Sequence, residues 1–198
     1  MDIRVIPEPT KLAVVVHTPT IAMRKELYIL MYQISREHRD EAMKVDGKNK
    51  NEEIKHSMIC ILFCYTCLEA FINTIGKDKL GNTWEERWGE NKESSTSDKW
   101  LGVSKLLASK KYAKQYSVFN KRKEPFKSFL CLQKIRHYYL VHWKAEFSEV
   151  VKTKYGNTDG TINKLNYNTA NKACNTVKEM VLELVKNMDD APEVNWLK

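Results

Sequence analysis

The sequence predicts an all-α fold, a bundle of four to five main helices in a single domain that spans residues 1–198. The chain holds only 7 Gly and 5 Pro, a composition that favours long helices over many short strands. Apolar residues recur three and four positions apart in several segments, which is the helical period. Two long segments, 51–76 and 125–147, are apolar on nearly every side, as is typical of helices buried inside a bundle.

The N-terminal part predicts a short extended arm followed by a helix. Within residues 1–19, the β-branched run from Val14 to Val16 favours extended structure. The core helices are expected within 20–147. The first of them covers 20–45 and ends at Asp46-Gly47, a pair that is common after a helix.

The second helix is expected over 51–76, with two glutamates in its first turn, where the helix dipole favours acidic groups. The sequence then becomes polar and broken up to Asp98. Trp84 and Trp88 are four residues apart and predict a short helical turn in this stretch. Ser97 or Asp98 is expected to cap the third helix.

After the fourth helix, 125–147, residues 150–166 contain a turn signal between two alternating pieces, which predicts either a small hairpin or a loop. A C-terminal amphipathic helix is expected over 167–188. The remaining tail is expected to fray unless Trp196 and Leu197 dock on the bundle.

The net charge of +8 is concentrated in one segment. Residues 105–127 contain eight basic side chains against Glu124 alone, a net +7. Lysines neutralise phosphates and aromatic rings stack on bases, so this segment predicts contact with single-stranded nucleic acid. The alternative is a solvated basic loop whose rings, Phe119 and Phe126 included, face the core. The candidate RNA-contacting residues are Lys110, Lys111, Lys114, Lys121, Arg122, Lys123, Tyr112 and Tyr116.

The five cysteines favour a reducing compartment, because they form no paired CxxC array. Cys60, Cys64 and Cys67 lie on one stripe of a helix and are interpreted as reduced core thiols, with a metal site or a redox switch as the alternative. No signal peptide is expected, since Pro7 and Pro9 follow a short N-terminus. The apolar run 12–16 is too short to span a bilayer. We therefore expect a cytoplasmic protein with no membrane contact and no cofactor.

The 125–147 helix carries Arg136, His137 and His142 in otherwise apolar surroundings, and such groups are costly to bury without partners. Glu69 and Asn73, four residues apart on the second helix, are the polar groups that could hold them. An imidazole can remove the proton of a 2′-hydroxyl, while a fixed cation stabilises the charge on a phosphate. These five residues are the candidate catalytic set.

The run from Arg136 to His142 resembles the R-x(4–6)-H motif of the HEPN superfamily (higher eukaryotes and prokaryotes nucleotide-binding domain), with His137 in the polar position that follows the Arg. The Glu69-x-x-x-Asn73 pair is similar to one on an earlier helix of many such families. The resemblance implies an all-α bundle that binds RNA, or a metal-independent ribonuclease, often dimeric across the motif helix. A homodimer through 125–147 is therefore expected.

Two other interpretations remain open. In the first, Arg136 forms a buried ion pair with Glu69, and His142 is a core histidine. The chain would then be a non-catalytic dimerisation or partner-binding module. Alternatively, carboxylates of the first two helices could hold Mg²⁺, as in all-α nucleotide pyrophosphohydrolases. The carboxylates in question are Glu37, Asp40, Glu41, Glu52, Glu53 and Glu69. His38 and His56 are isolated in sequence and suggest no ligand set.

Overall fold

The computed structural model describes residues 21–89, 92–108, 118–137 and 165–198, with only the backbone for 21–26. This part contains six α-helices and no strand: α1 (Ile21–Val45), α2 (Lys50–Leu80), α3 (Asn82–Trp88), α4 (Thr96–Leu107), α6 (Phe126–Ile135) and α9 (Tyr167–Lys186), with a 3₁₀ turn η2 (Asn195–Leu197). The all-α prediction is confirmed. The expected arm at 1–19, residues 138–147 and nearly all of 150–166 lie outside the described residues.

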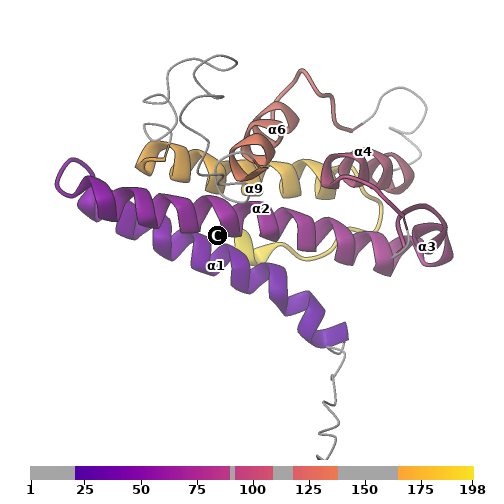
Figure 1. Ribbon diagram of the computed structural model, residues 1–198. Coiled ribbons are helices and arrows are strands. Elements are labelled where there is room, and N and C mark those ends of the chain that lie inside the picture. Colours follow the sequence, from indigo (N-terminus) through magenta and orange to yellow (C-terminus); the bar gives the residue numbers. More distant parts are fainter. Residues whose placement is uncertain (1–20, 90–91, 109–117, 138–164) are drawn as a thin grey trace, which may run out of the picture.

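The central element is α2, which contacts α1, α3, α4, α6 and α9 (Figure 1). A short turn joins α1 to α2, so the two helices form a hairpin and pack along each other. Gly47 in this turn has a φ of 68°, a conformation that glycine adopts without strain. The side chain of Asn49 then caps α2 by accepting a hydrogen bond from the amide of Glu52 at 3.3 Å.

By length and composition, α2 is the one described helix that could cross a membrane. Half of its most apolar 18-residue window is buried inside the fold. The central helix of a bundle has the same composition, and α2 occupies that place, with Leu68, Phe71 and Ile72 fully buried.

The second central helix is α9, whereas the sequence predicted that the helix over 125–147 would occupy this place. The described part of that segment, α6, packs mainly on α9 and touches α2 with few residues. It is amphipathic: Phe126, Phe129 and Leu132 are buried, while Cys131 and Lys134 face solvent. The stripe of α9 that enters the core consists of small and medium side chains, which allow close approach to α1 and α2. Its buried residues are Ala170, Ala173, Cys174, Thr176, Val177, Met180, Val181 and Leu184.

Glu53 ties the N-terminus of α9 to α2. Its carboxylate is 3% exposed and accepts hydrogen bonds from the amide of Tyr167 at 3.0 Å and from Nζ of Lys50 at 3.1 Å. Burial alone would raise the pKa of Glu53, but these two donors hold it below its usual value. Glu53 is therefore a structural carboxylate.

The C-terminal tail docks on the bundle. The indole of Trp196 lies 5.2 Å from the ring of Tyr28, 5.4 Å from Tyr32 and 6.0 Å from Phe71, measured between centroids. Leu197 is buried beside them. This aromatic cluster fixes the end of the chain against α1 and α2, so the tail does not fray.

Two tryptophans of α3 pack on glycines of neighbouring helices. Trp84 covers Gly76 of α2 so closely that a Cβ at this position would lie 2.2 Å from the indole. Trp88 covers Gly102 of α4, where a Cβ would lie 2.3 Å from the ring. The short helix expected around these tryptophans is confirmed. The prediction that α2 ends at Gly76 is wrong, since this glycine makes room for Trp84 and the helix continues to Leu80.

Ser95 caps α4, so the prediction that Ser97 or Asp98 is the cap is wrong. The Oγ of Ser95 accepts a hydrogen bond from the amide of Asp98 at 3.1 Å and donates to the Asp98 carboxylate at 2.7 Å. This reciprocal arrangement satisfies a free amide of the first turn.

His38 of α1 and His56 of α2, isolated in sequence, meet in the fold. Their Nδ1 atoms are 2.8 Å apart, a hydrogen bond in which one ring donates and the other accepts. Burial is the largest cause that lowers the pKa of His38, and the neighbouring His56 is the second. Lys55 lowers it further, whereas Glu37 and Glu41 raise it.

The Gly76→Ala substitution is expected to lower the free energy of unfolding by about 1–3 kcal/mol, the usual cost of overpacking. This loss exceeds the gain of about 1 kcal/mol in helix propensity. Urea unfolding measures it. In a Trp84→Leu background the same substitution is expected to be neutral or stabilising, so an equal loss in both backgrounds would contradict the Gly76–Trp84 contact.

Acidification is expected to destabilise the fold through His38. A lowered folded-state pKa means that the native state binds fewer protons than the unfolded chain. The contribution of the neutral His38 imidazole to the free energy of unfolding is complete above the unfolded-state pKa of about 6.5. It is lost as the pH falls through the folded-state pKa. Thermal unfolding between about pH 7.5 and about pH 5 should therefore show a smaller decrease in Tm for His38→Gln than for the wild type. An equal decrease in Tm in the two proteins would contradict a contribution from His38.

Candidate functional site

Arg136 follows the last residue of α6, and the backbone at Arg136 and His137 has the wider π-helical form. Its guanidinium carbon lies 4.8 Å from the centroid of the Tyr65 ring on α2. The side chain is half-buried, and its Nε is buried without a hydrogen-bond partner among the described residues. A cation over an aromatic face is attracted by the ring electrons, so Tyr65 orients the guanidinium.

Glu69 and Asn73 share a face of α2, as their spacing indicates, and both face α4. The Glu69 carboxylate accepts a hydrogen bond from Oγ1 of Thr96 at 2.8 Å, and the Asn73 side-chain oxygen accepts one from Nζ of Lys99 at 3.1 Å. Among the described residues, Glu69 forms no ion pair with Arg136. The buried Arg136–Glu69 pair of the alternative interpretation is therefore not formed.

Tyr65 lies between Arg136, which its ring contacts, and Glu69, which follows it on α2. The sequence analysis did not include Tyr65 among the candidate site residues. It lies one helical turn before Glu69 and is 2% exposed, with its ring stacked on Phe129 at 6.2 Å between centroids. Burial raises the pKa of its hydroxyl, partly offset by a hydrogen bond with Thr96. The i, i+4, i+8 series of Tyr65, Glu69 and Asn73 was the sequence signal that could have identified it.

The basic turn before α6 is anchored by core aromatics. Lys121, Arg122 and Lys123 are exposed, and the turn is closed by Oδ1 of Asn120, which accepts from the Arg122 amide at 2.8 Å. The rings that flank it are buried: Phe119 and Phe126 pack on each other and on Trp100 and Phe129. These two rings are core residues, in agreement with the alternative for this segment, and cannot stack on a base.

Several predicted site residues fall outside the described residues: His142, Lys110, Lys111, Lys114, Tyr112 and Tyr116. His137 is described and exposed beside Arg136. The described part of the candidate site is thus Arg136 and His137 at the end of α6, the basic turn 121–123 before it, and Glu69 with Asn73 against α4.

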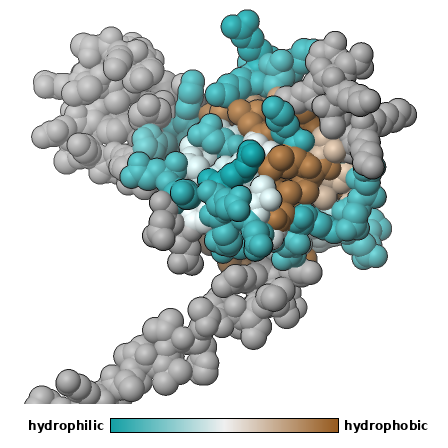
Figure 2. All heavy atoms as spheres, turned by 90° about the vertical axis from the view of Figure 1, so that its right-hand side faces the viewer, coloured by the Kyte–Doolittle hydropathy of each residue, from teal (hydrophilic) through white to brown (hydrophobic). Residues whose placement is uncertain are grey.

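A cleft of about 530 Å³ lies between α1, α2, α3 and α4. Of the predicted site residues that the structure describes, Glu69 and Asn73 line it, whereas Arg136, His137 and Lys121 do not. On the side of the molecule where α3 lies, Figure 2 shows an apolar area bordered by hydrophilic side chains. The cleft itself combines both kinds of group: Leu27, Met31, Trp84, Trp88, Lys77, Asp78, Lys92 and Lys99.

Five of the six carboxylates considered for Mg²⁺, all but Glu37, each bind other protein groups. Glu41 pairs with Lys44 at 2.6 Å, and Asp40 pairs with Arg39 at 2.7 Å. Glu52 contacts Lys55 and His56. Within the described part of the chain, three potential metal ligands converge at a single place, and that place is formed by thiols: Cys60, Cys64 and Cys174. Sequence reasoning missed this group because Cys174 lies on a different helix.

The fold and these side chains are the available basis for a functional assignment. No family model matches the chain, and no significant match was found among curated proteins or solved structures.

Proposed function

We propose that the chain is an HEPN-like RNA-binding protein or metal-independent endoribonuclease that acts on RNA phosphodiesters. In this proposal His142 is the base, Arg136 contacts the phosphate and His137 lies beside it. The motif resemblance between Arg136 and His142 suggests the activity, and the all-α architecture is compatible with it.

The main support is the state of Arg136. Its carboxylate partner in the competing interpretation, Glu69, is engaged by Thr96, and its buried Nε has no described partner. A guanidinium presents a planar fork that suits the two oxygens of a phosphate. Arg136 is therefore oriented by Tyr65 and ready for an anionic ligand.

The proposed reaction needs no metal ion. The imidazole of His142 would take the proton of a ribose 2′-hydroxyl, and the oxygen would then attack the adjacent phosphorus to form a 2′,3′-cyclic phosphate. The bond from phosphorus to the 5′-oxygen breaks in the same step, and the 5′-oxygen leaves with a proton from solvent. The charge that gathers on the phosphate oxygens would be stabilised by Arg136. The exposed turn 121–123, which leads into the same helix, would hold neighbouring phosphates. Glu69 and Asn73, which face α4, would act indirectly by fixing the helix that carries Tyr65.

RNA cleavage in the presence of EDTA tests the proposal. A single-stranded RNA is expected to be cut by the wild type, and Arg136→Ala or His142→Ala should reduce the rate by roughly 10²–10⁴-fold, the usual contribution of such groups. Lys134→Ala is the matched control, because it removes one positive charge from an exposed position on the same helix. Equal rates in all four proteins would reject the catalytic assignment.

A partner-binding module is the second candidate, and the cleft between α1 and α4 favours it. Its walls include Trp88, which is half-buried, and Leu27, which is 45% exposed. RNA affinity distinguishes the two candidates. Salt-sensitive RNA binding that weakens when Lys121, Arg122 and Lys123 become alanine supports the RNA proposal, and no RNA affinity supports the module.

A homodimer across the 125–147 helix is part of the proposal and has its own test. Cys131 is the exposed thiol of the five and lies on the solvent side of α6, where a second copy would pack. A short bismaleimide is therefore expected to link two chains through Cys131, and light scattering should give twice the chain mass of 23.2 kDa. Cys131→Ser should abolish the cross-link without changing the mass. A monomeric mass for the wild type would exclude the dimer.

A further inference from the structure

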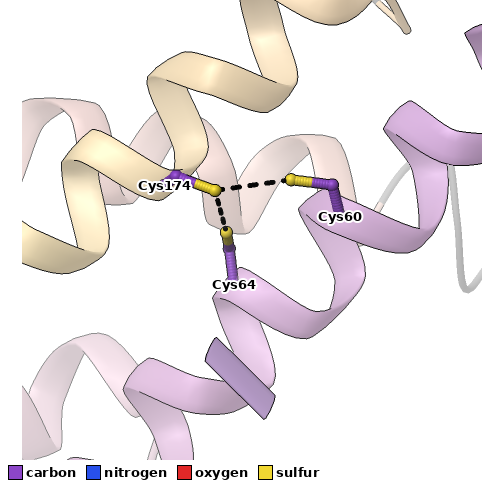
Figure 3. Close-up of side chains that lie close together, drawn as sticks. All are labelled: Cys60, Cys64 and Cys174. Atoms are coloured by element: carbon purple, nitrogen blue, oxygen red, sulfur yellow. Dashed lines mark hydrogen bonds between the residues drawn. The ribbon is translucent and has the colours of Figure 1, made fainter. Parts of the chain in front are cut away.

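Three thiols meet at the contact between α2 and α9 (Figure 3). Cys60 and Cys64 project from successive turns of α2, and Cys174 of α9 points between them. The Sγ atom of Cys174 is 3.6 Å from each of the other two sulfurs, and all three sulfurs lie within 4.8 Å of one another. The thiols are free, and their residues are 0%, 0% and 1% exposed.

These distances match a thiolate metal site. A Zn–S bond of about 2.3 Å places neighbouring sulfurs about 3.8 Å apart in a tetrahedral site and about 4.0 Å apart in a trigonal one. Two of the three sulfur separations are 3.6 Å, so a cation could bind between the sulfurs after shifts of a few tenths of an ångström. A disulfide would instead require two sulfurs to approach to about 2.05 Å.

The surroundings provide charge and a further donor. The guanidinium of Arg39 lies near enough to Cys174 for its positive charge to act on the sulfur. Three thiolates around a divalent cation carry one net negative charge, which Arg39 would offset, although Asp40 shares this arginine at 2.7 Å. Ser35, also buried, places its Oγ 3.9 Å from Sγ of Cys174.

We propose that Cys60, Cys64 and Cys174 bind one thiophilic divalent cation, such as Zn²⁺, which fastens α9 to α2. The three thiols release three protons to solvent as the three metal–sulfur bonds form. The fourth ligand is the Ser35 hydroxyl or a water molecule. The site is structural, because the sulfurs are enclosed by the core and line no described cleft.

The arrangement contrasts with that of the other two cysteines. Cys67 is on the same helix as Cys60 and equally buried, yet it does not belong to the three-sulfur group. Cys131 is exposed on α6. These two residues supply matched controls. Replacing Cys67 removes a buried thiol outside the three-sulfur group, and replacing Cys131 removes an exposed thiol.

The test uses the full chain, produced with Cd²⁺ in the medium so that the probe can enter while the core forms, and purified anaerobically with a non-thiol reductant. We expect one Cd²⁺ per chain, a thiolate-to-cadmium charge-transfer band whose intensity corresponds to three sulfurs, and a higher Tm than that of the metal-free protein. Cys174→Ser should weaken Cd²⁺ binding at least about 100-fold, the upper end of what loss of a supporting hydrogen bond costs at a metal site.

Cys67→Ser and Cys131→Ser should keep the wild-type stoichiometry and band. If Cys174→Ser does not fold, the stoichiometry and the three-sulfur band of the wild type still decide the matter. Wild-type protein without bound Cd²⁺, a band that persists in folded Cys174→Ser, or one that is lost equally in folded Cys67→Ser would overturn the proposal and leave three ordinary core thiols.

Discussion

The fold depends on burying the apolar side chains of α2, which surround much of that helix. Between Ile59 and Ile75, α2 is nearly continuously apolar, and leaving such a surface exposed would cost about 25 cal/mol for each Å². Five other helices contact α2 and share that task. Three polar side chains in this stretch project into contacts with neighbouring helices. Glu69 and Asn73 face α4, and Tyr65 faces Arg136.

The features of the fold that depend on local sequence could be predicted. Periodic apolar residues and polar turn residues gave the all-α class, and helices were expected at 20–45 and 51–76 where α1 and α2 now lie. The error at Gly76 shows the limit of local reasoning. Glycine ends helices because it adopts unusual backbone angles, but it also admits a bulky neighbour, and only the position of Trp84 decides between these uses.

The features that depend on contacts between distant residues were not predictable. Thr96 stands in a polar run that resembles a loop, so nothing in the sequence indicated it as the partner of Glu69. The same is true of Arg136 and Tyr65, which are joined by a cation–aromatic contact that leaves no spacing signature. His38 and His56 looked unrelated until the α1–α2 hairpin aligned them. In each case the partner is selected by the packing of two helices and not by either sequence alone.

The position of α9 has a kinetic consequence. The α1–α2 hairpin can form from neighbouring residues, but the core beneath it is completed by α9, whose Cys174 contacts a residue 114 positions earlier. Contacts across such separations require the chain to close a large loop before any burial rewards it, and proteins rich in them fold slowly. We therefore expect the α1–α2 hairpin to form early with an exposed apolar face. This face is a binding site for chaperones until α9 packs on it.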